Sequence, residues 1–250
     1  SIGCHPGLGI AVLADGMGGH KGGEVASALA VDAILSSLKN SLKQLEPGGF
    51  DENTGYSLES MAIENAIKEA NQVIYDASRN NTNYEGMGTT VVVLLFYDNR
   101  ITIAHVGDSR LYRMRENNLE QLTRDHTLIQ ELVDRGFYSE DDAQQSMNKN
   151  LVTRAVGVNP EVEVDLLEDV GLPQDIYLLC SDGLTDMLDD HFIEDIILDY
   201  KTNLEHIAKE LIKQANANGG RDNISALLAM PTKAYPASAN WISKITDLFS

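Results

Sequence analysis

The sequence feature that most constrains the fold is a pair of long apolar, largely β-branched runs joined by three polar residues. The runs are "TTVVVLLFY" at 89–97 and "ITIAHV" at 101–106, and the connection is "DNR" at 98–100. A connection this short joins antiparallel neighbours, so the runs predict a hairpin. The following "LYRMRENNLEQL" extends the hairpin into a meander with "ENN" as its next turn. The sheet is therefore predicted to be antiparallel here.

Further strands and helices can be placed from hydrophobic periodicity. Apolar runs predict strands at 8–14, 176–180 and 224–229, and helical spacing predicts helices at 24–45, 58–78, 190–200 and 203–217. A short helix is expected at 126–135, capped by Asp125 and ended at Gly136, and another is expected to start near Ser139. Strands in meander order, interrupted by pairs of helices, predict antiparallel sheets covered by helices on the outside.

Size and charge exclude several classes of protein. A chain of 250 residues with 43% hydrophobic content can bury one large core, so one domain is expected. The net charge of -19 repels nucleic-acid phosphates and argues against a nuclease or a nucleic-acid-binding protein. No apolar run approaches the roughly 20 residues of a membrane helix, and no signal region opens the sequence. We expect a cytoplasmic protein without a disulfide, in which Cys180 is a buried hydrophobe.

Aspartates recur where apolar runs end or begin. They are Asp15 in "VLADG", Asp108 in "AHVGDS", Asp182 in "LLCSDG" and Asp222 in "GGRDNIS". A single Asp-Gly would indicate only a turn. Four such residues on core strands can meet at one rim of antiparallel sheets, where unpaired carboxylates would repel one another unless a cation neutralised them. The pattern therefore predicts a cation site.

The type of ligand indicates the type of cation. Carboxylates and backbone carbonyls, without a cysteine or histidine cluster, suit Mg²⁺ or Mn²⁺ rather than zinc or copper. Gly16 lacks a side chain, so its carbonyl can approach a metal held by Asp15. Several aspartates around two such ions are typical of sites that activate a water for attack on a phosphate.

The glycine-rich stretch after Asp15 fits no nucleotide-binding loop. No glycine in it is followed by Lys and then Ser or Thr, as a P-loop requires. The dinucleotide pattern GxGxxG begins at Gly16 and Gly18 but meets Lys21 where its third glycine belongs.

Seven motifs together resemble one enzyme family. "ADGMGGHKGGEVAS", "GTTVVV", "HVGDSRLYR", "LTRDHT", "LVTRAVG", "LLCSDGLTD" and "GGRDNIS" occur in this order over about 10–230. They are similar to the metal-dependent protein serine/threonine phosphatases of type 2C (the PPM family), in their bacterial form. The resemblance implies an α+β fold: a central antiparallel β-sandwich flanked by helix pairs on both faces, with a flap near the active site.

The resemblance also implies roles for individual residues. Asp15 would bridge two metal ions and the Gly16 carbonyl would bind one of them, while Asp182 and Asp222 would complete the other. Bacterial members hold a third ion more loosely, which here implies Asp108 and Asp186 as ligands.

Two departures from the family pattern affect the site. The flap corresponds to about 136–152, where many relatives have His-Pro and this chain has "QQSMNKN". Relatives also carry a phosphate-binding arginine and an acidic metal ligand just upstream of the residue aligned with Ser1. Either the intact protein has these residues in a preceding segment, which we favour, or the molecule lacks them.

Several other residues allow two interpretations. His20 is a candidate general acid, and equally a polar residue at the start of a helix. His105 and His126 are interpreted as structural. Arg110 and Arg221 could contact phosphate, but structural salt bridges are expected for both. Thr89 and Thr90 are expected to make packing and backbone contacts.

The sequence therefore predicts a phosphatase domain at 1–231 and a tail at 232–250. The expected reaction is hydrolysis of protein phosphoserine and phosphothreonine at a centre of two Mg²⁺ or Mn²⁺ ions, with a third ion as an addition. Expected partners are phosphorylated proteins and, from the resemblance, an opposing serine/threonine kinase; nucleic acid and membrane are not expected, and the molecule is expected to be a monomer. The alternatives are a catalytically lapsed metal-binding module and a two-metal phosphodiesterase.

Overall fold

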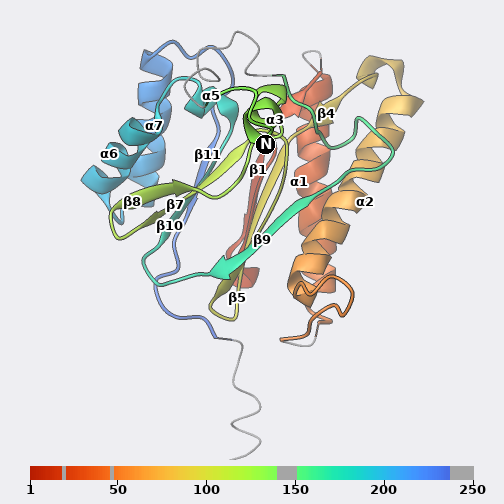
Figure 1. Cartoon of the computed structure of the whole chain (residues 1–250). Helices are drawn as coiled ribbons and strands as arrows, with labels where there is room; N and C mark the ends of the chain where they lie inside the picture. The colour runs from red at the N-terminus through yellow and green to blue at the C-terminus, as the bar shows by residue number, and fades with distance from the viewer. Residues whose placement is uncertain (19–20, 46–47, 140–150, 237–250) are drawn as a thin grey trace, which may run out of the picture.

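The computed structural model describes residues 1–18, 21–45, 48–139 and 151–236. Two antiparallel sheets pack face to face, and a pair of helices covers the outer face of each (Figure 1). The helices are α1 (Gly22–Ser41) and α2 (Leu58–Asn80) on one side, and α6 (Asp190–Tyr200) and α7 (Leu204–Ala217) on the other. This arrangement confirms the predicted fold class.

The first sheet contains the predicted hairpin. Its strands, in spatial order, are β1 (Ile2–His5), β2 (Ile10–Leu13), β5 (Val91–Tyr97), β6 (Arg100–Val106) and β9 (Asp165–Val170). Asp98 and Asn99 join β5 to β6 with φ of 45° and 55°. Positive φ at both residues is the conformation of the two-residue turns that match the twist of a hairpin.

The second sheet carries the meander onward. Its strands, in spatial order, are β11 (Ala226–Ala229), β10 (Ile176–Cys180), β7 (Arg110–Arg115) and β8 (Asn118–Gln121). Glu116 and Asn117 form the turn between β7 and β8, again with positive φ. A small third sheet pairs β3 (Gly16–Met17) with β4 (Gly88–Thr89).

Strand β9 is absent from the sequence prediction. Its residues, "DLLEDV", include three acids, and the sequence analysis assigned no strand or helix to them. Only one of its sides has a partner strand, because β9 is an edge of the five-stranded sheet. An edge strand tolerates charged residues that a central strand does not, so its hydrophobic alternation is weak.

The short helix at the predicted 126–135 begins and is capped differently from the prediction. Helix α3 spans Leu128–Asp134, and the Thr127 side chain accepts a hydrogen bond from the Gln130 amide. Asp125 was predicted as the cap, which is wrong, because its carboxylate binds Arg110 instead. Helix α1 also ends at Ser41 rather than at 45. The helix expected near Ser139 falls on 140–150, outside the described residues.

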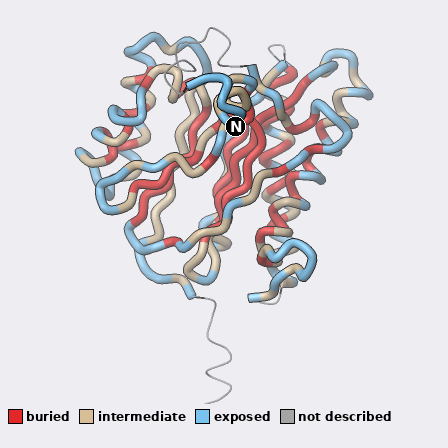
Figure 2. Tube along the Cα trace, in the orientation of Figure 1, coloured by how far each residue is buried: buried red, intermediate tan, exposed pale blue. Residues whose placement is uncertain are grey.

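The central strands alternate their side chains between two cores. In β5, Val91, Val93 and Leu95 pack against α1 and α2, while Val92 and Leu94 face the other sheet. In β10, Leu178 packs on the side of α6 and α7, and Leu179 packs between the two sheets. Figure 2 shows these central strands as the most continuously buried part of the molecule. In the part of the chain described, none of the helices is long and apolar enough to cross a membrane.

Truncation of Leu94 tests the core between the sheets. Leu94 is fully buried there, so Leu94→Ala removes apolar contacts and leaves a cavity between two rigid sheets. We expect a loss of about 2–5 kcal/mol in the free energy of unfolding, measured by urea denaturation. Val73→Ala, at a half-exposed position of α2, is the control and should cost well under about 1 kcal/mol. Equal midpoints for the two variants would contradict the sandwich core.

Candidate active site

Asp15 follows a buried strand and is held by its backbone. It lies two residues beyond the end of β2, and the Thr90 amide donates to its carbonyl at 2.8 Å. The Thr89 hydroxyl donates to the same carbonyl at 2.8 Å, and the Asp15 amide donates to Thr90 Oγ1 at 3.1 Å. These bonds confirm the backbone role expected for the two threonines. They also fix the direction in which the Asp15 chain leaves the sheet.

The glycines after Asp15 allow a close approach of two backbones. A Cβ at Gly16 would overlap the Gly23 carbonyl at the start of α1, and a Cβ at Gly23 would overlap the Gly16 carbonyl. Side chains at either position would push β3 away from the helix. The glycine cluster therefore seats β3, and the Gly16 carbonyl that follows Asp15, directly against α1.

Asp182 and Asp222 come from separate loops that one serine joins. Asp182 begins the short helix α5 (Asp182–Thr185) after β10, and Asp222 lies in the loop before β11. The preceding Ser181 donates from Oγ to the Asn223 carbonyl at 3.1 Å, and the Ser225 amide donates to Ser181 Oγ at 3.0 Å. Ser181, which the sequence analysis did not single out, thus links the two acid-bearing loops.

Asp108 lies in the turn between β6 and β7 and is 7% exposed. The preceding Gly107 has φ of 106°, and a Cβ there would overlap the Thr90 side chain. Asp186 ends α5, and its amide donates to the Asp182 carbonyl at 2.8 Å. All five predicted acids are thus placed by strand ends or by α5.

The electrostatics show that these acids converge. Burial, followed by the negative charges of Asp182, Asp222 and Asp108, raises the pKa of Asp15 to about 7. Burial, followed by Asp182 and Asp125, raises the pKa of Asp108 to about 7. The pKa of Asp182 is also raised, by burial first and then by Asp222, with Asp186 adding to the effect. The tertiary structure therefore brings together acids from four separate segments.

The donors fit a hard divalent cation. Asp182 Oδ1 is buried and has no hydrogen-bond partner among the described residues. Asp108 is buried and Asp15 and Asp182 are partly buried. Carboxylates that repel one another in such surroundings, with an oxygen left unpaired, are stabilised by a cation. All the donors in this cluster are oxygens, which is the set that Mg²⁺ and Mn²⁺ favour.

A second polar group lies around His105, His126 and Asp165. Their ligand atoms lie within 4.8 Å of one another, the only such group of histidine, cysteine or acid residues found within the described ranges. His105 Nε2 is 2.8 Å from the Arg124 carbonyl, and Arg154 donates to Asp165 at 2.5 Å. The two rings stack, with centroids 4.6 Å apart. Both histidines therefore have structural contacts, as predicted. Their contact with Asp165 could not be predicted, because Asp165 lies on β9 and that strand is absent from the sequence prediction.

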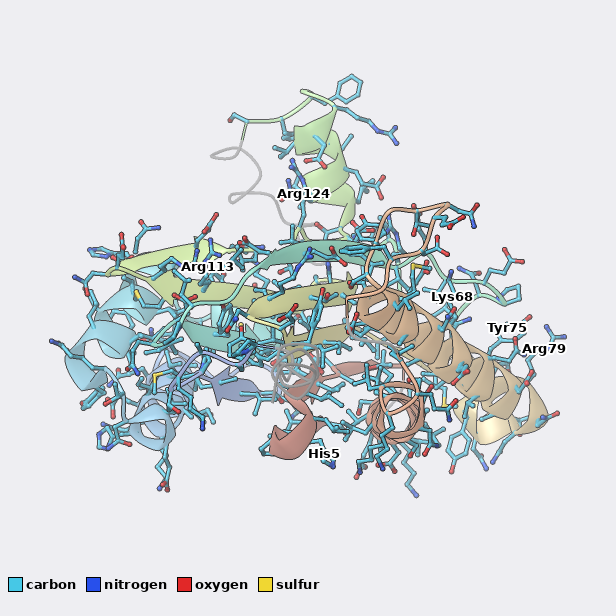
Figure 3. All side chains as sticks on the ribbon, turned by 90° about the horizontal axis from the view of Figure 1, so that it is seen from below. His5, Lys68, Tyr75, Arg79, Arg113 and Arg124 are labelled. Carbon is cyan, nitrogen blue, oxygen red and sulfur yellow. The ribbon has the colours of Figure 1, made fainter. Side chains whose placement is uncertain are left out.

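The two arginines singled out in the sequence differ in their contacts, and the remaining candidates lie mostly outside the described residues. Arg110 makes the predicted salt bridge, with Nη2 2.7 Å from Asp125 Oδ2. The salt bridge expected for Arg221 is not observed among the described residues, because Arg221 lies exposed in the loop before β11. His20 and most of the predicted flap lie outside the described residues. Figure 3 shows α3, which leads towards the flap region, standing away from the sheets with Arg124 beside it.

Comparison with known proteins gives a consistent result. The sequence matches the protein phosphatase 2C family over residues 4–229. It is 40% identical over 219 residues to the serine/threonine phosphatase stp of Listeria welshimeri, which covers 88% of this chain and 83% of that protein. It is 36% identical over 226 residues to the serine/threonine protein phosphatase PstP of Mycobacterium tuberculosis, covering 90% of this chain and 41% of that protein.

Solved structures show the same fold. The crystal structure of Mycobacterium tuberculosis PstP/Ppp superposes with a TM-score of 0.80 at 35% identity, covering 92% of this chain and 91% of that one. A structure of the PstP catalytic domain in complex with two manganese ions gives a TM-score of 0.75 at 33% identity, with 92% and 90% covered. From its sandwich, its converging acids and these similarities, the chain belongs to the protein phosphatase 2C family, in its bacterial form.

Proposed function

We propose that this phosphatase hydrolyses phosphoserine and phosphothreonine in proteins with Mg²⁺ or Mn²⁺ as its cofactor. The observation that carries the proposal is the convergence of Asp15, Asp108, Asp182 and Asp222, with the pKa of Asp15 and of Asp108 raised to about 7. Such a cluster is costly unless divalent cations bind to it. The names of the relatives, which include serine/threonine phosphatases, support the substrate class.

The chain offers the following ligands. Asp15 and the Gly16 carbonyl would hold the two principal ions together with Asp182 and Asp222, and Asp108 and Asp186 would hold a third. When bound, the ions supply positive charge to the phosphate oxygens and acidity to the attacking water. Thr89 and Thr90 keep Asp15 in place through its backbone, and Ser181 keeps the loops of Asp182 and Asp222 together.

Two parts of the reaction rest on residues whose structure is not described. We propose His20 as a candidate for protonating the leaving serine or threonine oxygen, on the strength of its position near Asp15 in the sequence. The segment around 136–152 is the proposed flap.

Charge and cysteine content bear on the cellular setting of the protein. We propose a catalytic domain at 1–231 followed by a tail, a monomeric and cytoplasmic protein, and a serine/threonine kinase as the opposing partner. The net charge of -19 favours protein over nucleic-acid substrates. Cys4 and Cys180 form no disulfide, which accords with a reducing compartment.

A metal-dependence assay tests the proposal. The intact protein is incubated with a phosphothreonine peptide and Mn²⁺, with and without excess chelator, and released phosphate is measured. We expect release that depends on Mn²⁺ and stops with chelator. Tight Mn²⁺ binding without turnover would instead support a lapsed binding module, and cleavage restricted to phosphodiesters would indicate a nuclease.

A further inference from the structure

Gly107, the residue before Asp108, is held through both of its backbone groups by His126. The His126 amide donates to the Gly107 carbonyl at 3.0 Å. The Gly107 amide donates in return to His126 Nδ1 at 3.0 Å. Gly107 has φ of 106°, a conformation that residues with side chains rarely adopt. The direction of the turn that carries Asp108 therefore depends on this pair of bonds.

His126 is itself fixed by contacts with three other segments. Its carbonyl accepts a hydrogen bond from the Thr153 amide at 2.8 Å, and its ring stacks on His105 of β6. Its Nε2 lies 3.2 Å from Asp165 Oδ2 on β9, and only 7% of the residue is exposed. A ring locked in this way is a rigid support for the bond to Gly107.

The hydrogen bond at Nδ1 excludes His126 as a metal ligand. Because Nδ1 accepts the Gly107 N–H, Nδ1 carries no proton, and the proton of the neutral ring is on Nε2. Nε2 faces Asp165, so neither ring nitrogen has a free lone pair for a cation. The carboxylate of Asp165 is also bound by Arg154. The buried group around His126 therefore supports the backbone and does not compete with the aspartates for metal.

We propose that His126 is a positioning residue for Asp108: it orients the Gly107–Asp108 turn through the Nδ1 bond and thereby sets how well Asp108 can serve a cation. The inference rests on the proposed function, in which Asp108 is a ligand of the third ion. Substitution of residues that orient metal ligands typically lowers metal affinity by about 10–100-fold. The proposal requires that metal affinity falls when the bond between Nδ1 and Gly107 is lost, and not when the contact between Nε2 and Asp165 is lost.

Two substitutions separate the two sides of the ring. The Asn side chain places an oxygen near the position of Nδ1, whereas the Gln side chain places a polar group near Nε2. We expect His126→Asn to keep the bond to Gly107 and to stay within about 3-fold of the wild type. We expect His126→Gln to keep the contact with Asp165 but to raise the half-saturating Mn²⁺ concentration of peptide hydrolysis by about 10-fold or more.

A second measurement does not depend on activity. Hydrogen exchange of the Gly107 amide, measured in the metal-free protein, should be faster in His126→Gln than in the wild type and nearly unchanged in His126→Asn. His191→Asn and His191→Gln, on the exposed face of α6, are matched controls for both readouts. Equal behaviour of the two His126 variants in both measurements would overturn the proposal.

A double-mutant cycle tests whether the effect of His126→Gln is only a general loss of stability. In an Asp108→Asn background, His126→Gln should add nothing further to the Mn²⁺ requirement, because the ligand that it orients is gone. An undiminished further effect in that background would show that His126 acts elsewhere and would contradict the inference. If the wild-type protein released no phosphate at all, the proposed function would fail, whereas the Gly107 exchange experiment would still test the role of His126.

Discussion

Asp182→Asn is expected to lower phosphatase turnover by at least about 10³-fold while leaving the protein folded. The variant loses a charged ligand from the acid cluster, and metal assistance of this kind contributes several kcal/mol of transition-state stabilisation. The fold should survive, because Asp182 Oδ1 has no hydrogen-bond partner among the described residues. Loss of its charge also relieves the repulsion that raises the pKa of Asp15.

The test compares three proteins under identical conditions. Turnover with saturating Mn²⁺ and unfolding of the metal-free protein are measured for the wild type, for Asp182→Asn and for Asp199→Asn. Asp199 lies exposed on α6 and should change neither quantity. We expect the metal-free Asp182→Asn protein to melt no lower than the wild type. Near-normal turnover in this variant would remove Asp182 from the site, and collapse of the fold would show that its role is structural.

The metal-free protein is expected to lose stability as the pH rises from about 4 to 7, and Mn²⁺ should reverse the loss. Folding raises the pKa of Asp15 and of Asp108 from 3.8 to about 7. Between these values the folded state binds more protons than the unfolded state, so the free energy of unfolding decreases with increasing pH. Above pH 7 both carboxylates are charged and the whole destabilisation is present.

Thermal unfolding at a series of pH values checks this expectation. With chelator, Tm should fall from pH 5 to pH 7.5. At pH 7.5, Mn²⁺ at about 100 times its dissociation constant adds about 2.7 kcal/mol, which corresponds to a rise in Tm of about 5–10 °C. An Asp15→Asn, Asp108→Asn double variant should show a flatter pH profile and a smaller response to Mn²⁺. Identical pH profiles for the metal-free wild type and the metal-free double variant would rule out the raised pKa values.

The close agreement between the predicted and observed strands has a local cause. The runs Val91 to Leu95 and Ile176 to Cys180 are buried on both faces, so both are strongly apolar and predict strands clearly. The failures also have causes. Strand β9 is an edge with acids in its sequence, and Asp125 was assigned to a helix cap because its partner Arg110 lies 15 positions away.

The candidate site was predictable only in part. Asp15, Asp108, Asp182 and Asp222 could be singled out because each lies beside an apolar strand, where an acid needs an explanation. Ser181 could not, since a serine beside an aspartate has many ordinary uses, and only the pairing of β10 with β11 places it against Asn223 and Ser225.

The sequence by itself determined the antiparallel meander, the helix pairs and the set of acids, because hydrophobic periodicity and residue chemistry are local properties of a chain. The tertiary structure alone decided that the acids come together, which raises the pKa of Asp15, Asp108 and Asp182. It also decided that His126 holds the backbone beside Asp108. Both facts depend on distances between residues remote in sequence. Such distances follow from how the two sheets pack and from which strand lies at each edge, and no short stretch of residues encodes them.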